Sequence, residues 1–274
     1  MVHWLSGLSL AGIVIFSLGS MLAAVVLGHA MYVLQHRRGK VKEDHSQEGY
    51  LVGGMIGVLA LLMAFSFGMA LDRFEERRHL VIQEANAIGT SYLRAQLLDE
   101  PHRTRLSNLL VAYTDNRIEL ASAKPAQQAQ RLAANDRLLT EIWAAVTAAR
   151  ESAAAHSISV PLLNTYNEVI DLDTERKVAR QVRVPAPLLV LLYGFLVITA
   201  AVIGYVLEER RARIGAFVFF LLLSFYVAII ADLSRPASGS IRESQEPMLM
   251  LRASLKSQPP KVFDQYAFPG RVNP

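Results

Sequence analysis

The chain has 274 residues, of which 52% are hydrophobic and only 19% are charged. This composition and the mean hydropathy of +0.28 exclude a soluble enzyme, while the formal net charge of +4 fits a membrane protein whose basic residues flank anionic headgroups. The sequence contains no cysteine, which excludes disulfides, iron–sulfur clusters and thiolate zinc sites.

Four long segments without charged side chains alternate with charged stretches. A transmembrane helix needs about 17 to 25 apolar residues, and each segment is long enough. The first segment is longer than the apolar core of a signal peptide, so we predict that it is retained as a helix. The predicted fold class is all-α: a polytopic membrane protein with four transmembrane helices, at residues 5–35, 51–71, 185–207 and 214–232.

Two short loops, at residues 36–50 and 208–213, connect the spans in pairs. They contain seven basic residues: Arg37, Arg38, Lys40, Lys42, Arg210, Arg211 and Arg213. The positive-inside rule favours such loops in the cytoplasm, which would leave the long insert between spans two and three outside. Nine basic residues flank the opposite membrane ends, however, so the charge count does not decide the orientation.

The second span carries small residues three or four positions apart. They are Gly53, Gly57, Ala60, Ala64 and Gly68. Small residues at this spacing let helices approach closely. We therefore expect this span to be central to packing, either within the subunit or around an axis shared by several subunits.

The middle of the same span contains candidates for a pore lining or constriction. They are Leu62, Phe65, Ser66 and Phe67. Large apolar side chains around a narrow pore form a hydrophobic gate that closes by dewetting. The alternative is that these aromatic rings face lipid.

Residues 72–184 are predicted to form a water-facing helical bundle. Apolar residues recur three or four positions apart in four stretches, with breaks at Pro101, Pro125 and Pro161. The stripes consist of Val81, Ala85, Ile88, Tyr92 and Ala95; Leu106, Leu109, Leu110, Tyr113 and Leu120; Leu132, Leu139, Ile142, Trp143 and Val146; and Leu162, Leu163, Tyr166, Val169 and Ile170. We expect four antiparallel helices around one core, the first and last extending the second and third spans.

A cluster of polar residues is predicted where the first and fourth bundle helices run side by side. Both polar stretches lie about three helical turns from the membrane, so antiparallel packing would place them at similar height. The candidates are Glu84, Asn86, Asn164, Asn167, Glu168 and Asp171. Two roles fit them: lining a vestibule or binding a cation, or solvating and cross-linking the bundle through hydrogen bonds.

Ionisable residues follow two of the spans on the same side of the membrane. Asp72 and Arg73 follow the second span, and Asp232 and Arg235 follow the fourth. An ionisable residue at a membrane end is a functional candidate. The alternative is that these side chains snorkel or form Asp–Arg pairs at the interface.

The remaining tail, residues 233–274, contains a short amphipathic helix after Pro247 that fits either the headgroup region or a site on the bundle. The residues from Gln258 onward are expected to be extended or mobile. HExxH, GxSxG and phosphate-binding glycine motifs are all missing from the sequence, so we expect no enzyme activity, no metal and no cofactor. Lys and Arg form no stripe with interleaved aromatics, so nucleic acid is not an expected partner.

Three sequence blocks carry a resemblance to a known family. They are LDRFEERRHLVIQEANAIGTSYLRAQLL after the second span, LNTYNEVIDLDTERKVARQVRVP before the third and DLSRPASGSIRESQEPML after the fourth. In this order they resemble the bacterial bestrophin-like family, a domain of unknown function, over nearly the whole chain. Bestrophins are pentameric anion channels with four spans and a helical cytosolic part.

The resemblance implies a homo-oligomer in a bacterial plasma membrane, a pentamer by analogy, with a cytoplasmic insert. The leading hypothesis is therefore an anion channel or pore lined by the second span. Its expected partners are membrane lipid, further copies of the chain and a small anion. The alternative is a non-conducting membrane sensor or scaffold whose helical domain binds a partner.

Overall fold

Helices form almost the whole of the described chain. The computed structural model describes residues 9–37, 45–207, 210–235 and 239–267, and within these ranges it contains ten helices and no strand. Four of the helices are long and apolar enough to cross a membrane, so the predicted all-α class with four spans is confirmed. The chain divides into two compact units, the membrane unit (Met1–Glu75 and Val182–Arg242) and the bundle unit (Glu76–Gln181 and Glu243–Pro274).

The four membrane helices are α2 (Leu10–Arg37), α3 (His45–Ala95), α8 (Ala186–Val206) and α9 (Arg210–Leu233). Residues 38–44 and 208–209 of the two predicted short loops lie outside the described residues. Helix α3 has 51 residues and belongs to both units. It runs without a break because it contains no proline, which would remove a helical hydrogen bond.

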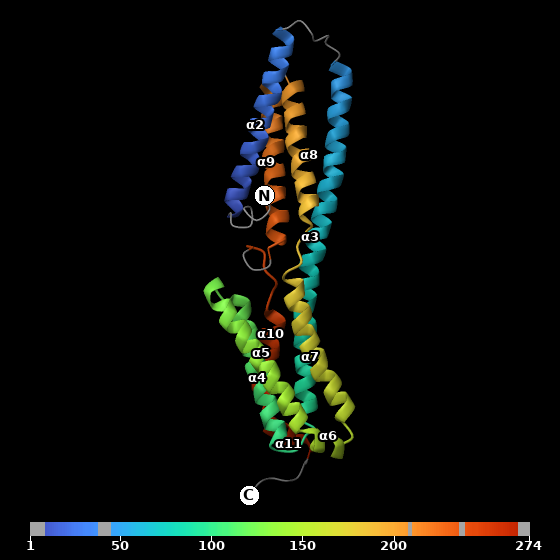
Figure 1. The fold of residues 1–274 in the computed structure, drawn as a ribbon, viewed down its shortest axis with the longest axis vertical. Coiled ribbons are helices and arrows are strands. Elements are labelled where there is room, and N and C mark those ends of the chain that lie inside the picture. The colour runs from blue at the N-terminus through green and yellow to red at the C-terminus, as the bar shows by residue number, and fades with distance from the viewer. Residues whose placement is uncertain (1–8, 38–44, 208–209, 236–238, 268–274) are drawn as a thin grey trace. The chain divides into compact units, whose positions relative to one another are not determined.

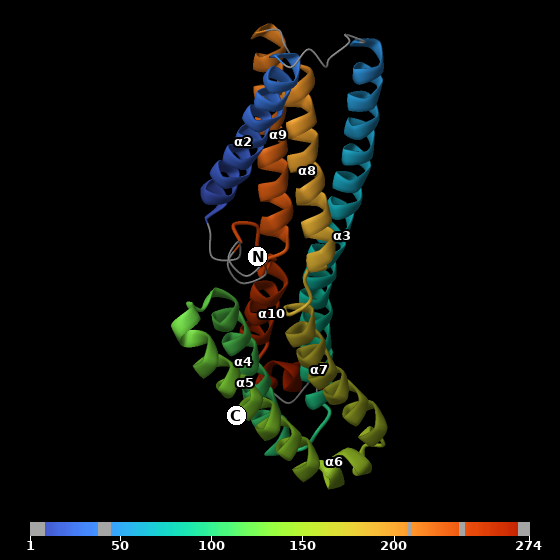
Figure 2. The same cartoon turned by 45° about the horizontal axis from the view of Figure 1, so that its top comes forward.

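Two glycines allow α2 and α8 to pack backbone against backbone. Helix α2 lies against α8 and α9, as both ribbon views show (Figures 1 and 2). A methyl group on Gly28 would overlap the carbonyl oxygen of Ala201, and one on Gly204 would overlap that of Val25. This close helix crossing thus uses glycines of the first and third spans, which were not among the predicted packing residues.

The bundle unit combines the second part of α3 with four further helices of the insert: α4 (His102–Ser122), α5 (Pro125–Ala148), α6 (Arg150–Ala155) and α7 (Ser159–Ala179). Its core contains side chains from the predicted stripes of α3, α4 and α7, including Ile88, Leu110, Tyr113, Tyr166 and Val169. Each of these five is fully buried. A helical bundle with one shared core is therefore confirmed.

The third predicted stripe is only partly correct. Ile142 and Val146 of α5 are buried, whereas Leu132 and Trp143 are 37% and 42% exposed. Trp143 directly follows Ile142, and neighbouring residues on a helix lie about 100° apart. One of the two must therefore point away when the other faces the core.

Helix α7 does not continue into the third span, contrary to prediction. It ends at Ala179, and α8 begins at Ala186. Pro185 and Pro187 lie at this junction. A proline ring clashes with the helical carbonyl four residues earlier, and the residue before it avoids helical geometry. Only the first bundle helix therefore extends a membrane span.

The C-terminal tail forms two helices that belong to the bundle unit. Helix α10 (Glu246–Ser257) buries Met248 and Leu255 in the bundle core, which favours the docked alternative over the headgroup region. Helix α11 (Pro260–Ala267) forms where an extended chain was expected. Pro260 starts this helix, a position where its missing N–H has no cost.

Candidate functional site

The small residues of α3 face away from the rest of the membrane unit. A methyl group added to Gly53, Gly57 or Gly68 would meet no atom within 4 Å, and Ala60 and Ala64 are exposed. The predicted small-residue stripe therefore does not pack against another described helix of the same subunit. Of the two roles expected for it, packing within the subunit is therefore not seen among the described helices.

The predicted constriction residues divide between two sides of α3. Phe65 is 60% exposed on the same face as the small residues, and the neighbouring Leu61, which the sequence analysis missed, is 71% exposed. Ser66 is fully buried and donates a hydrogen bond to the carbonyl oxygen of Leu62 at 2.8 Å. Phe67 packs against Tyr226 of α9, with ring centroids 5.7 Å apart. Phe65 and Leu61 are therefore the most exposed of the bulky side chains in the middle of α3, ahead of Val58 at 48%.

Leu62 is the fourth of these candidates, and it lies on the inner side of α3 with Phe67. It packs against the apolar core of the membrane unit. Leu62 and Phe67 therefore pack α3 against its own subunit, and the buried Ser66 bonds within α3. The outward face of α3, as we use the term, consists of Gly53, Gly57, Ala60, Leu61, Ala64 and Phe65.

Asp232 has a structural role at the end of α9. Its side chain is buried, and its two carboxylate oxygens accept hydrogen bonds from the backbone N–H groups of Ser240 (2.9 Å) and Ile241 (2.8 Å). The backbone N–H of Arg235 donates to the carbonyl oxygen of Asp232 at 2.9 Å. Asp232 therefore closes the turn after the fourth span.

The other membrane-end charges are more accessible. Asp72 is exposed and Arg73 is partly buried on α3. Partial burial lowers the pKa of Arg235, and the nearby carboxylate of Asp232 opposes this shift. These positions match the interfacial placement that was the alternative to a functional role.

Five of the six predicted polar residues line one open groove of the bundle unit. Asn86 of α3 lies there with four residues of α7, and Gln83, Leu172 and Glu175 complete the lining of a cavity of about 530 Å³. The four predicted residues of α7 are Asn164, Asn167, Glu168 and Asp171. We call this cavity the polar groove. Its lining contains three carboxylates and four amides and no Lys or Arg, so its electrostatic potential is negative.

Glu84, the sixth predicted polar residue, is fully buried in the bundle core instead of lining the polar groove. It accepts hydrogen bonds from the Tyr113 hydroxyl (2.7 Å) and from Nη2 of Arg117 (3.0 Å), and it forms an ion pair with Arg176. Burial alone would raise the pKa of the Glu84 carboxyl, but Arg117, Arg176 and Tyr113 together hold that pKa below its ordinary value.

A second carboxylate continues this interaction. Asp173 of α7 accepts from Nη1 of Arg117 at 3.0 Å and from Nδ2 of Asn135 at 2.9 Å. The buried charge network therefore links four helices, and it comprises Glu84, Tyr113, Arg117, Asn135, Asp173 and Arg176. Such a network of buried ion pairs and hydrogen bonds fixes the relative positions of helices.

Sequence reasoning missed all of this network except Glu84. The signal lies in the apolar stripes: Glu84 falls between Val81 and Ala85, and Arg117 falls four residues after Tyr113. A charged residue at a core-facing helical position needs a buried partner of opposite charge. Among the described residues, no group of His, Asp or Glu side chains is arranged to hold a metal ion.

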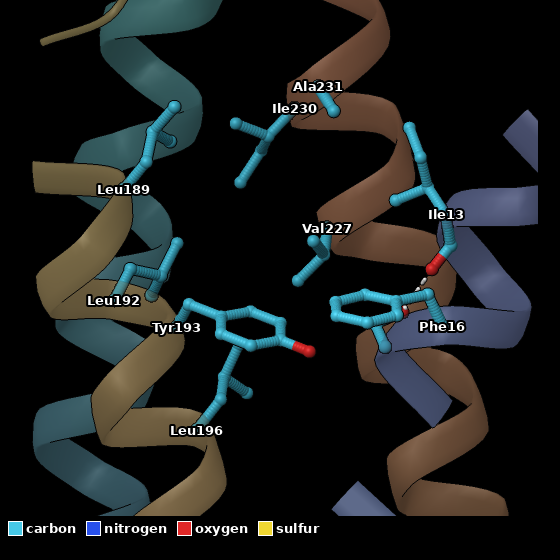
Figure 3. A pocket seen from close by; sticks show the side chains of 10 residues that line it. Ile13, Phe16, Leu189, Leu192, Tyr193, Leu196, Val227, Ile230 and Ala231 are labelled. Carbon is cyan, nitrogen blue, oxygen red and sulfur yellow. Dashed lines mark hydrogen bonds between the residues drawn. The ribbon is translucent and has the colours of Figure 1, made fainter. Parts of the chain in front are cut away.

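The membrane unit contains an apolar cavity of about 80 Å³ between α2, α8 and α9 (Figure 3). Its walls include Ile13, Leu192 and Ile230, and the rings of Phe16 and Tyr193 stack at its edge with centroids 6.1 Å apart. The Tyr193 hydroxyl forms a hydrogen bond with that of Ser20 at 2.5 Å. None of the side chains that line this cavity is charged.

Solved structures share the fold of this chain. A variant of a bacterial bestrophin homolog from Klebsiella pneumoniae is 16% identical and aligns with a TM-score of 0.65, covering 93% of this chain and 99% of its own. A second variant of that homolog is 17% identical with a TM-score of 0.66, covering 89% and 98%. At this identity the likeness establishes the fold. A search of curated proteins gave no match.

A family model extends the likeness to the sequence itself. The model of the bestrophin-like domain matches residues 19–248. This range contains most of α2 and all of α3, α8 and α9, together with the whole insert and the start of α10. The chain therefore belongs to the bestrophin-like family.

Proposed function

We propose that this protein is a homo-oligomeric ion channel of the bacterial plasma membrane whose pore is lined by α3. The observation that carries this proposal is the outward face of α3, where Gly53, Gly57 and Ala64 have no packing partner among the described helices. Copies of α3 arranged around a common axis would place these small residues close together. A ring of identical subunits closes when each uses the same pair of surfaces.

The outward face also supplies a gate. Leu61 and Phe65 lie one helical turn apart and are both largely exposed, so a ring of them would narrow the pore and make it apolar. Water leaves such a constriction readily, and small movements of the helices open it. The proposed gate therefore consists of Leu61 and Phe65, and the buried Ser66 takes no part in it.

We also propose that the charged side chains of the polar groove act on the permeating ions. The family resemblance implies a pentamer and a small anion as the conducted ion. The groove itself contains Glu168, Asp171 and Glu175, and fixed carboxylates enrich cations near them. The family resemblance and the groove carboxylates thus predict conducted ions of opposite sign, so the test below measures the flux of both chloride and potassium.

The test combines oligomer mass with ion flux. The purified full-length protein is expected to form a ring of several subunits in detergent and to conduct ions in proteoliposomes. Phe65→Ala should raise the flux by widening the constriction. Phe225→Ala on α9, which is similarly exposed at 51%, is the matched control and should leave flux unchanged. A monomer without flux to either chloride or potassium would overturn the proposal.

Water access to the pore gives a second readout, because the chain has no native cysteine. A single cysteine at Ala64 should react with a water-soluble thiol reagent in sealed proteoliposomes, whereas one at Phe225, which is exposed on α9 away from the proposed pore lining, should not. Equal protection of both positions would mean that α3 does not line an aqueous path.

A non-conducting scaffold is the second candidate. It is favoured by Trp143 and Leu132, which are exposed on α5 of the bundle unit. Exposed tryptophan is enriched where proteins bind partners. If the protein is a scaffold, Trp143→Ala should abolish recovery of a partner from membranes and leave the mass of the oligomer unchanged.

A further inference from the structure

A second cavity of the membrane unit lies between α2 and α9, with the backbone of α8 as its floor. Its volume is about 250 Å³, and Val25, Val26, Gly204, Ala216 and Phe217 are among its lining residues. We call it the α2/α9 groove. Val26 and Phe217 at its rim are 67% and 44% exposed, so the groove opens on the surface of the membrane unit.

Small residues leave this space open. Gly204 of α8 adds no side chain to the lining, and it lies directly against the backbone of Val25, which brings α8 close to α2. Ala216 contributes only a methyl group from α9. An engineered protein cavity of about 150 Å³ holds a benzene molecule, so a groove of 250 Å³ has room for a larger apolar group.

One end of the groove is polar and basic. His29 and Arg213 are the polar side chains of its lining, and both belong to the membrane end that carries the short basic loops. Next to them Tyr32 stacks between His29 and His36, with ring centroids 6.3 and 5.7 Å apart, and meets the edge of the Tyr205 ring. Aromatic residues of this kind mark the level of the lipid headgroups.

The apolar cavity of Figure 3 provides an internal comparison. It is formed by the same three helices nearer their other end, but none of its lining side chains carries a charge. Of these two cavities, only the α2/α9 groove combines apolar walls with a cationic side chain, that of Arg213. The groove is chemically complementary to an amphipathic anion. The alkyl chain of such a ligand would lie along the apolar walls, and its negative group would lie at the basic end.

We infer that the α2/α9 groove binds an anionic glycerophospholipid. One acyl chain lies against Val25, Gly204 and Ala216, and the phosphate accepts hydrogen bonds from the guanidinium of Arg213 and a ring N–H of His29. Arginine suits phosphate because its planar fork can donate two parallel hydrogen bonds. This inference concerns lipid recognition and holds whether or not the assembled protein conducts ions.

Native mass spectrometry of the full-length protein tests the inference, with phosphatidylglycerol and phosphatidylcholine added separately after delipidation. We expect saturable phosphatidylglycerol binding and much weaker phosphatidylcholine binding. Ala216→Phe fills the groove and should abolish the specific adduct. Ala23→Phe, on an exposed part of α2 outside the groove, is the matched control and should bind as the natural protein does.

The basic end of the groove is tested by Arg213→Gln, which should weaken phosphatidylglycerol binding about fivefold. Arg213→Lys should retain most of the binding. Circular dichroism and oligomer mass verify that each variant is folded. Equal binding of the two lipids, or normal binding by Ala216→Phe, would overturn the inference. The inference would also be overturned if the natural protein bound no lipid and Ala216→Phe reduced the mass of the oligomer. That result would mean that a neighbouring subunit occupies the groove.

Discussion

Two features of the sequence predict different positions for the Glu84 side chain. Its spacing from the membrane placed it with the exposed polar residues of α3 and α7, but its position within the apolar stripe of α3 turns it into the core. There it interacts with Tyr113, Arg117 and Arg176. Apolar periodicity gives the direction of each side chain on a helix, and for Glu84 it was the better guide.

We expect Glu84→Gln to destabilise the bundle unit by about 3 kcal/mol or more, because two buried guanidinium groups would lose their common counter-charge. Glu168→Gln, on the exposed side of α7, should change stability by less than about 0.5 kcal/mol. Thermal unfolding in detergent measures both effects. Equal melting temperatures of the two variants would contradict a stabilising role for the buried charge network.

The same residue predicts a dependence on pH. Because the folded-state pKa of Glu84 is lowered from 4.5, the unfolded chain binds the proton more readily than the folded one. The stabilisation from ionised Glu84 is therefore complete above about pH 4.5 and is lost as the pH falls through the lowered folded pKa. The stability difference between the natural protein and Glu84→Gln should shrink in that acidic range and stay constant near neutrality.

At the scale of elements, the sequence predicts helices well and their junctions less well. Four charge-free segments identified the spans, and apolar stripes identified α3, α4 and α7 of the bundle, since both signals follow directly from helical geometry. The break before α8 was missed although Pro185 marks it. Helix α10 could be placed only by the structure, because an amphipathic segment fits a membrane surface and a protein core equally well.

The crossing of α2 and α8 was also missed, although Gly28 lies four residues after Ala24 and Gly204 lies four residues after Ala200, a spacing of small residues that allows close helix packing. We expect Gly204→Ala to destabilise the membrane unit by about 1–3 kcal/mol, because the added methyl group meets the backbone of Val25. Gly194→Ala lies on the same helix with nothing within 4 Å and should stabilise it slightly. Thermal unfolding compares the two, and a larger loss at Gly194 would mean that the helices cross elsewhere.

At the scale of the whole molecule, the sequence predicts assembly of several copies of the chain. The small-residue stripe of α3 left open whether it packs within or between subunits, and its exposure in the single chain favours packing between them. We expect Gly57→Leu to reduce the mass of the detergent complex, because the bulky side chain would separate neighbouring copies of α3. Gly19→Leu, at an equally open position on α2, should leave the mass unchanged. Intact rings in both variants would remove α3 from the subunit interface.

Ion selectivity is likewise a property of the assembly, because each subunit contributes the three carboxylates of its polar groove. Neutralising Glu168, Asp171 and Glu175 together, as Gln, Asn and Gln, removes three negative charges per subunit. The reversal potential under a KCl gradient should then shift toward the chloride equilibrium potential, and the shift should diminish at high salt because fixed charges are screened. A control that neutralises Glu141 and Glu151, both exposed outside the groove, should show no such shift. If the groove variant also leaves the reversal potential unchanged, permeating ions do not pass these carboxylates, and the selectivity must arise along α3 itself.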